Sequence, residues 1–294
     1  MKRRLKAVLM VIVLLATIGA FTYYFVKHPE AIRQLGDIAA WQLALIFGLY
    51  LVFVWSIALI LEATVTLCRA TIPVRDSVLI TMWSSIINFF GPLQSGPAFR
   101  AVYLKKVHGI SLKNYGIASL LYYGFYAAFS GLFLVSGLIP WPVMLGVIVL
   151  GIAVALIFLR LPVKLARQIR TLPLRETYKL ALATLIQVSV MAAIYTVELK
   201  SIDSHIAVQQ AIVYTGAANF ALFVSLTPGA IGFREAFLVF SENLHHIDHA
   251  TILAASVLDR SAYIVLLGVL FLAASSMHLQ DRFTVKKSTK ITTS

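Results

Sequence analysis

Long apolar runs recur along this chain, and they constrain its fold more than any other feature of the sequence. Each run approaches the roughly 20 residues that a helix needs to cross about 30 Å of hydrocarbon. The runs cover residues 5–26, 39–61, 115–139, 141–159, 180–199 and 252–277. The sequence therefore predicts an all-α fold, a polytopic membrane helical bundle of about six spans.

The composition leaves too few polar residues to cover a water-facing surface. Sixty per cent of the 294 residues are hydrophobic and 13% are charged, against about 45–50% and 25% in ordinary globular domains. The net charge of +13 does not indicate nucleic-acid binding, because the basic residues stand in short clusters between apolar runs. The one cysteine, Cys68, excludes an internal disulfide, and no cysteine–histidine spacing typical of a zinc site occurs.

Two further apolar stretches, 77–92 and 206–228, end in turns rich in proline and glycine, and each is followed by an arginine. Proline and glycine break a helix there, and the freed backbone groups are tolerated at membrane depth only inside protein or beside water. We therefore expect two re-entrant helical hairpins rather than full spans. The expected turn residues are Gly91, Pro92 and Gly96 in the first hairpin and Pro228, Gly229 and Gly232 in the second. Such a pair of interrupted segments is typical of a transporter binding site.

Lysine and arginine gather in alternate loops. The basic clusters lie in 2–6, 69–75, 105–113, 160–179 and 282–290. Cytoplasmic loops are the ones enriched in these residues, so six crossings, with both hairpins returning to the side they enter from, place every cluster and both termini in the cytoplasm. The first run is too long for a signal peptide and lacks a cleavage site, so we expect an uncleaved span. We expect a multi-pass protein of a bacterial inner (plasma) membrane.

The two hairpin segments also share a residue pattern. It reads Asn88-Phe89, a turn and Phe99-Arg100 in the first segment, and Asn219-Phe220, a turn and Phe233-Arg234 in the second. Coincidence among apolar residues is the alternative, but matched polar and charged residues beside broken turns favour a real repeat. Three spans separate the hairpins, so the repeat is expected to be inverted. The chain 1–294 is then one transmembrane domain, divided into 1–38 (first span and outer loop), 39–139 (first repeat), 140–179 (linking span and basic cytoplasmic loop), 180–278 (second repeat) and 279–294 (basic cytoplasmic tail).

Both segments resemble the transmembrane region of lysylphosphatidylglycerol synthases and its stand-alone, hopanoid-associated relatives. Residues 228–235, Pro-Gly-Ala-Ile-Gly-Phe-Arg-Glu, are similar to the late Pro-Gly-Gly-x-Gly-x-Arg-Glu hairpin of that family, and Leu258-Asp259-Arg260 is similar to its following helix. Residues 96–100, Gly-Pro-Ala-Phe-Arg, keep the glycine and arginine of the early hairpin but lack its carboxylate. The resemblance implies a flippase-like region, because in the large synthases this part is thought to flip the lipid that a separate soluble domain makes.

Five charged residues fall in segments expected at membrane depth: Arg100, Arg234, Glu235, Asp259 and Arg260. Each unpaired charge costs about 2.5–3.5 kcal/mol on insertion scales, so five together would exceed the about 5–15 kcal/mol that holds a fold. We therefore expect pairs such as Asp259 with Arg234 and Glu235 with Arg260. The network is either purely structural or a site where arginine forks bind an anionic headgroup beside the N-terminus of the helix that Pro228 and Gly229 open.

In the second reading Arg234 and Arg260 are the expected headgroup ligands, and Arg100 contributes less because its half lacks the carboxylate. Glu235 and Asp259 hold the arginines in position or take up a proton. A histidine cluster offers a further possibility, a metal site formed by His245, His246, Asp248 and His249. A solvated loop is favoured there, since no further ligand lies nearby.

The sequence contains no nucleotide-binding, nucleophile-elbow or metalloprotease motif, so neither an enzyme nor a cofactor is expected. The leading expectation is a transporter that moves a phospholipid or polyprenyl-phosphate-type headgroup across the inner membrane, with membrane lipids as its partners. One alternative is an accessory partner of an envelope-lipid synthesis enzyme acting on aminoacyl-, glycosyl- or hopanoid-lipids. A lipid-modifying transferase is the less favoured alternative, because the longest cytoplasmic loop is too short to build its site.

Overall fold

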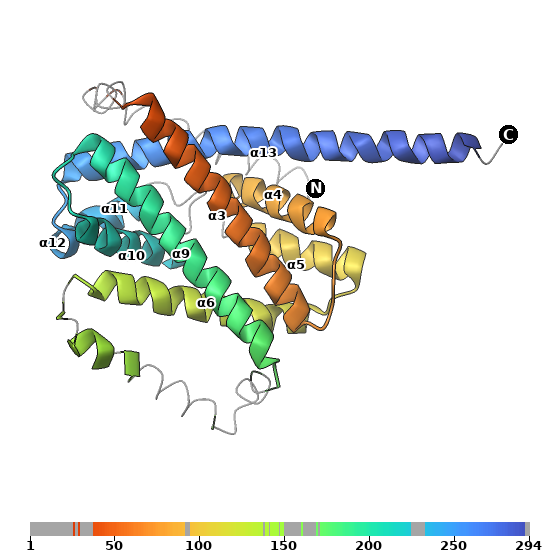
Figure 1. The fold of residues 1–294 in the computed structure, drawn as a ribbon, viewed down its shortest axis with the longest axis horizontal. Helices are drawn as coiled ribbons and strands as arrows, with labels where there is room; N and C mark the ends of the chain where they lie inside the picture. Colours follow the sequence, from red (N-terminus) through yellow and green to blue (C-terminus); the bar gives the residue numbers. More distant parts are fainter. Residues whose placement is uncertain are drawn as a thin grey trace, which may run out of the picture.

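The computed structural model describes residues 38–91, 95–137, 171–224 and 233–291, and single residues or short pieces at 26, 29, 139–140, 142–146, 148–149, 160 and 169. The ribbon in Figure 1 shows these parts as helices, and the described residues form no β-strand. The helices are α3 (Ala40–Leu67), α4 (Val74–Phe90), α5 (Ser95–His108), α6 (Leu112–Val135), α9 (Leu174–Ile202), α10 (Val208–Val224), α11 (Phe233–Phe240), α12 (Glu242–His245) and α13 (His249–Ile291). The prediction of an all-α fold is confirmed for these ranges.

Four helices are long and apolar enough to cross a membrane, namely α3, α6, α9 and the His249–Met277 part of α13. They contain 24–29 residues, which at 1.5 Å per residue reach about 36–43 Å and exceed the hydrocarbon thickness of about 30 Å. Four of the six predicted spans are thereby confirmed, and the protein is a multi-pass membrane protein. The predicted span 5–26 lies almost wholly outside the described residues, and only the pieces 142–146 and 148–149 of the predicted span 141–159 are described.

The outer faces of these helices carry large apolar side chains that are exposed in the described part of the chain. Trp41 and Trp55 on α3 are 66% and 55% exposed, and Val265 and Leu272 on α13 are 60% and 69% exposed. A contiguous apolar surface of this kind is unfavourable in water but is solvated by lipid tails. Inside, α3 and α9 lie side by side through the centre of the bundle (Figure 1), and they bury Tyr50, Tyr195 and their neighbours against α13.

Helices α4 and α5 fold back on each other as a hairpin (Figure 1). The Ser95 hydroxyl donates to the carbonyl of Ile87 at 2.7 Å, and the N–H of Gly96 donates to Asn88 Oδ1 at 3.2 Å. A side chain at Gly96 would place its Cβ 2.6 Å from the carbonyl oxygen of Ser84, so only glycine permits this approach. With 17 and 14 residues, the two helices reach about 26 and 21 Å, short of a full span.

The second half repeats this order of helix lengths. A long span, α9, precedes α10 with 17 residues and the short α11 with 8 residues, and α13 follows. Helix α11 packs against α10 and α13. The predicted turn residues Pro228, Gly229 and Gly232 lie outside the described residues, as does Pro92. This order of long and short helices agrees with the predicted repeat, although α11 is shorter than α5, and both the repeat and its inversion across the membrane stay predictions.

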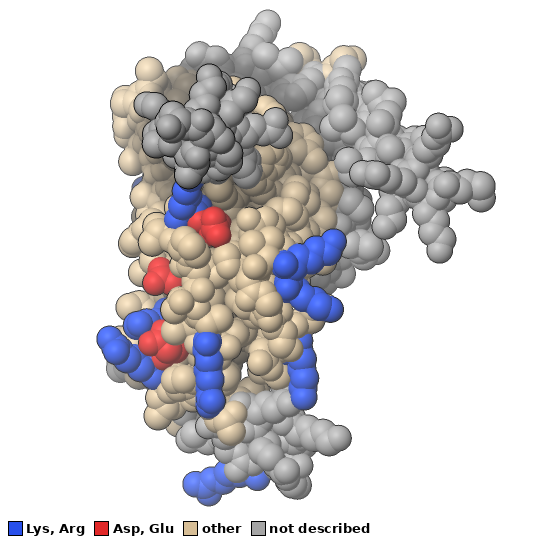
Figure 2. Space-filling view, turned by 90° about the vertical axis from the view of Figure 1, so that its right-hand side faces the viewer, with Lys and Arg blue, Asp and Glu red and all other residues tan. Residues whose placement is uncertain are grey.

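Basic side chains gather at one end of the bundle, where α3 and α5 end and α4 and α6 begin (Figure 1). Figure 2 views the molecule from this side and shows lysine and arginine side chains spread over it. The exposed basic residues of these helix ends are Arg69, Arg75, Lys105, Lys106 and Lys113. These are two of the clusters that the sequence assigns to the cytoplasm. Their common location agrees with that assignment, and the side of the membrane stays a prediction.

Candidate functional site

A buried ion pair joins the short helix α11 to the last span. Arg234 on α11 places its Nη2 atom 2.7 Å from Oδ2 of Asp259 on α13, and the two residues are only 3% and 5% exposed. Two tyrosines complete the pair. Nη1 of Arg234 donates to the hydroxyl of Tyr195 on α9 at 3.0 Å, and the hydroxyl of Tyr50 on α3 donates to Oδ1 of Asp259. One charge pair therefore ties together α3, α9, α11 and α13.

Glu235 lies between two arginines. Its Oε1 atom is 3.4 Å from Nη2 of Arg260 and 3.6 Å from Nε of Arg234. Successive residues on a helix point about 100° apart, which explains why Asp259 meets Arg234 while Arg260 meets Glu235. Both predicted pairs, Asp259 with Arg234 and Glu235 with Arg260, are confirmed.

Arg100 lies on α5, away from these ion pairs, and it bonds a neutral hydroxyl group instead of a carboxylate. Its Nε donates to the hydroxyl of Ser84 on α4 at 2.7 Å. Among the described residues, no carboxylate lies within salt-bridge distance of this guanidinium. The missing carboxylate noted in the early hairpin thus leaves Arg100 with a neutral hydrogen-bond partner.

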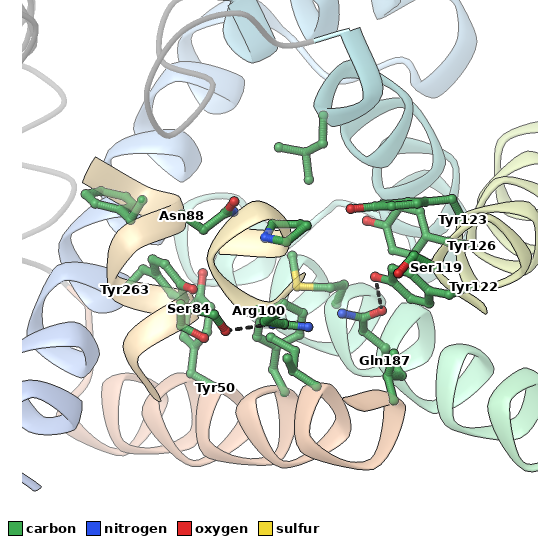
Figure 3. Close-up of a pocket in the computed structure, with 18 of the residues that line it drawn as sticks. Tyr50, Ser84, Asn88, Arg100, Ser119, Tyr122, Tyr123, Tyr126, Gln187 and Tyr263 are labelled. Atoms are coloured by element: carbon green, nitrogen blue, oxygen red, sulfur yellow. Dashed lines mark hydrogen bonds between the residues drawn. The ribbon is translucent and has the colours of Figure 1, made fainter. Parts of the chain in front are cut away.

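These three arginines meet at one cavity of about 250 Å³ in the middle of the bundle. Its charged lining consists of Arg100, Arg234, Arg260 and Asp259. Figure 3 shows Arg100 between Ser84, Tyr50 and Tyr263 on one side and Gln187 with the tyrosines of α6 on the other. The remaining polar lining includes Ser85, Asn88, Tyr115, Ser119, Tyr122, Tyr123 and Tyr126. Of the predicted turn residues that the structure describes, Gly91 lines the cavity and Gly96 lies in the adjoining hairpin contact.

Much of the polar lining forms hydrogen bonds within the protein: Ser84 and Ser85 donate to the carbonyl of Thr81, and Asn88 accepts from Gly96. The Tyr122 hydroxyl donates to Oε1 of Gln187 at 2.9 Å, and Ser84 serves Arg100. Arg234 and Arg260 are paired with Asp259 and Glu235, so the positive charge in excess at this cavity is that of Arg100, which has no carboxylate partner among the described residues. In a low-dielectric membrane interior this field favours an anionic group strongly.

Sequence reasoning missed Glu198, Tyr50 and Tyr195. Glu198 on α9 is fully buried, and neither carboxylate oxygen has a hydrogen-bond partner among the described residues. A signal was available, because a carboxylate inside the predicted span 180–199 is itself a functional indication. The two tyrosines carried no such signal, since buried tyrosines in helical bundles usually serve packing.

Residues of the histidine cluster near α12 form hydrogen bonds with neighbouring residues. Nε2 of His245 donates to the carbonyl of Leu238 at 3.0 Å, and Nδ1 accepts the N–H of Ile247 at 3.2 Å. Burial lowers the pKa of His245. Asp248 accepts hydrogen bonds from Thr251 at the start of α13. The described residues contain no group of three or more histidine, cysteine, aspartate or glutamate side chains that could hold a metal ion.

A comparison with protein families gives one match. The family described as Lysylphosphatidylglycerol synthase TM region matches residues 7–270. The matched range contains the four described spans up to Leu270 and all the charged residues of the cavity. No curated protein and no solved structure matches the chain.

Proposed function

Because the chain belongs to the lysylphosphatidylglycerol synthase transmembrane-region family, we propose that it is a flippase-like transporter that moves an anionic lipid headgroup across the membrane. The observation that carries this proposal is the cavity inside the helical bundle, which is lined by three arginines and a single carboxylate. The headgroup is of the phospholipid or polyprenyl-phosphate type, since both present phosphate oxygens. The activity is transport, and the protein makes or breaks no bond in the lipid.

The chemistry of the lining supports a phosphate group. A guanidinium presents a planar fork that matches two phosphate oxygens and keeps its charge at any cellular pH. Tyrosine and serine hydroxyls make the rest of the lining polar. A volume of about 250 Å³ lies just below the range of small-molecule pockets, about 300–1,000 Å³. The cavity therefore suits a headgroup, while the acyl chains stay in the surrounding lipid.

The three arginines take different parts in this proposal. Arg234 is committed to Asp259 and Tyr195, so it shapes the electrostatic field and offers the headgroup only its remaining donor capacity. Arg260 is shared with Glu235 at the longer distance of 3.4 Å. Arg100 contacts the hydroxyl groups of Ser84 and Tyr115 and, among the described residues, no carboxylate, which makes it the arginine most available to an anionic ligand. Glu235 and Asp259 are positioning residues that hold Arg260 and Arg234.

The architecture proposed for transport is an inverted repeat. Its two halves, α3–α6 and α9–α13, each contain a pair of short helices, α4–α5 and α10–α11, that re-enter from opposite sides of the membrane. The shortness of these helices and their shared position beside the cavity support this arrangement. Rocking of one half against the other around a central site is the general mode of such folds. Both termini are cytoplasmic in this proposal, and the membrane is the bacterial inner membrane.

Lipid binding by charge variants tests the proposal. The full chain is reconstituted in nanodiscs of zwitterionic phosphatidylcholine and titrated with phosphatidylglycerol. We expect Arg100→Gln to weaken phosphatidylglycerol binding about tenfold or more, because a hydrogen bond to a charged group contributes about 1.5–3 kcal/mol. Arg100→Lys keeps the charge but loses the fork, so a smaller loss is expected.

Lys105→Gln is the matched control, since it removes a positive charge from an exposed position of the same helix. It should leave the affinity unchanged. Equal affinity of wild type and Arg100→Gln for phosphatidylglycerol, with both proteins folded, would contradict the proposed site.

A further inference from the structure

Glu198 is a buried carboxyl group that the proposed transport site does not use. It lies three residues after Tyr195 on α9, on the same face of the helix, because residues three apart are neighbours on a helix surface. Its side chain is fully buried, and neither oxygen has a hydrogen-bond partner within the described part of the chain. The group is therefore both hidden from solvent and unsatisfied.

The surroundings of Glu198 are unusually rich in charge and in hydroxyl groups. They come from every helix packed around it: α3, α9, α10, α11 and α13. The groups that face it electrostatically are Tyr50, Tyr195, Tyr214, Arg234, Asp259 and Arg260. His245 lies beyond Tyr214, with ring centroids 5.5 Å apart. Glu198 thus adjoins the lining of the cavity without being part of it.

The charges around Glu198 determine whether its carboxyl group is protonated. Arg234 and Arg260 are matched by Asp259 and Glu235 through the three ion pairs already described. An ionised Glu198 would add a second negative charge beside Asp259, with no donor and no solvent to stabilise it. Burying such a charge is far less favourable than burying a neutral acid. Arg234, Arg260, Asp259 and Glu235 already balance one another, and a protonated Glu198 leaves that balance unchanged.

We propose that Glu198 is a proton-binding site linked to the headgroup cavity, so that an anionic headgroup and a proton bind cooperatively. In this step a water-borne proton adds to one carboxylate oxygen, and the carboxyl group becomes neutral. An anion in the cavity adds negative charge near Glu198 and strengthens proton binding. By reciprocity, a proton on Glu198 strengthens binding of the anion by the same factor. The linkage to lipid rests on the proposed function, whereas the proton on Glu198 does not.

Infrared spectroscopy of the full chain, without added anionic lipid, tests the protonation directly. In nanodiscs of phosphatidylcholine at neutral pH, wild type should show the carbonyl band of a buried protonated carboxylic acid. Glu198→Gln should lack that band. Glu176→Gln is the matched control, because it makes the same change on the same helix at a glutamate that pairs with Lys179, and it should keep the band. An unchanged band in Glu198→Gln would overturn the proposal.

Stability provides a second readout. Glutamine has the shape of a protonated glutamate, so Glu198→Gln should fold and unfold like wild type at neutral pH. Failure of this variant to yield folded protein, while Glu176→Gln is obtained normally, would also overturn the proposal, because it would show that the negative charge is needed.

Phosphatidylglycerol titrations at mildly acidic and mildly basic pH test the linkage. We expect wild type to bind more weakly as pH rises past the point where Glu198 loses its proton, by at most about tenfold per pH unit for one proton. Glu198→Gln should bind tightly with no such dependence, which separates Glu198 from His245. A pH dependence that persists in the variant would overturn the linkage. No phosphatidylglycerol binding at any pH, with the acid band still present in wild type, would refute the proposed function and leave the proton site intact.

Discussion

Arginine and carboxylate side chains pair inside this bundle because either charge would be unfavourable there without a counterion. The cost of an unpaired charge at membrane depth is about 2.5–3.5 kcal/mol on insertion scales, and that cost is what allowed both ion pairs to be predicted from the sequence. The same reasoning could not find Tyr50 or Tyr195, since nothing in the chain distinguishes a tyrosine that bonds a buried charge from one that packs. Glu198 was within reach of the argument, because it is a carboxylate inside a predicted span.

The pairing of Asp259 with Arg234 makes a prediction about stability. Asp259→Asn removes the near counterion of the buried Arg234 guanidinium and leaves only Glu235 at 3.6 Å, so the free energy of unfolding should fall by about 3 kcal/mol, the lower end of the range for a broken buried pair. In the double variant Asp259→Asn, Arg234→Gln both charges are gone, and the loss should be smaller than in Asp259→Asn alone. Unfolding of the purified variants in detergent, followed by circular dichroism against urea or heat, measures both. If Asp259→Asn were as stable as wild type, the ion pair would not make the predicted contribution to stability.

The hairpin of α4 and α5 was predicted from the proline- and glycine-rich turn in the sequence, and the structure explains why glycine is needed there. Gly91 ends α4, and Gly96 in α5 lets the two backbones approach. The position of the break could be predicted from the sequence. Which side chains of α6 and α9 would line the resulting cavity could not, because it depends on how distant helices pack.

Gly96→Ala tests this hairpin. The new Cβ would lie 2.6 Å from the carbonyl oxygen of Ser84 and 2.7 Å from Cβ of Asn88, so α4 and α5 must separate. We expect a loss of about 1–3 kcal/mol in stability, the usual range for overpacking, together with weaker phosphatidylglycerol binding. Gly116→Ala on α6 is the control, because no atom lies within 4 Å of the added Cβ, and alanine is the better helix former. Equal stability of the two variants would contradict the close contact.

At the scale of the whole molecule, the side of the membrane on which each end of the bundle lies can be measured. After replacement of Cys68 by serine, single cysteines are placed at Lys106 and Asn243, which are exposed at opposite ends of the bundle. A membrane-impermeant thiol reagent added to intact cells should label the Asn243 site, while the Lys106 site should react only after permeabilisation. The reverse pattern would overturn the predicted topology. The control is the cysteine-free protein, which should remain unlabelled.

The four spans that the structure describes, and their order, could be predicted because hydrophobic length is a local property of the chain. The convergence of Arg100 with Arg234 and Arg260 on one cavity was less accessible. Arg100 was expected to contribute less because its carboxylate is missing, yet that absence leaves its guanidinium with neutral hydroxyl partners, Ser84 and Tyr115, among the described residues. Whether an arginine is available to a ligand depends on the contacts that it already makes in the folded protein. Those contacts depend on how distant helices pack, which the local sequence does not determine.

Movement of the headgroup itself tests the central claim most directly. Wild type is reconstituted into phosphatidylcholine vesicles that contain a trace of fluorescent phosphatidylglycerol, and a reductant added outside quenches the probe in the outer leaflet. We predict that quenching passes beyond the outer-leaflet fraction in wild-type vesicles and in Lys105→Gln vesicles. In Arg100→Gln vesicles it should slow about tenfold, in line with the lost charge-assisted hydrogen bonds. Quenching that stops at the outer leaflet in wild-type vesicles, as in protein-free ones, would contradict the account.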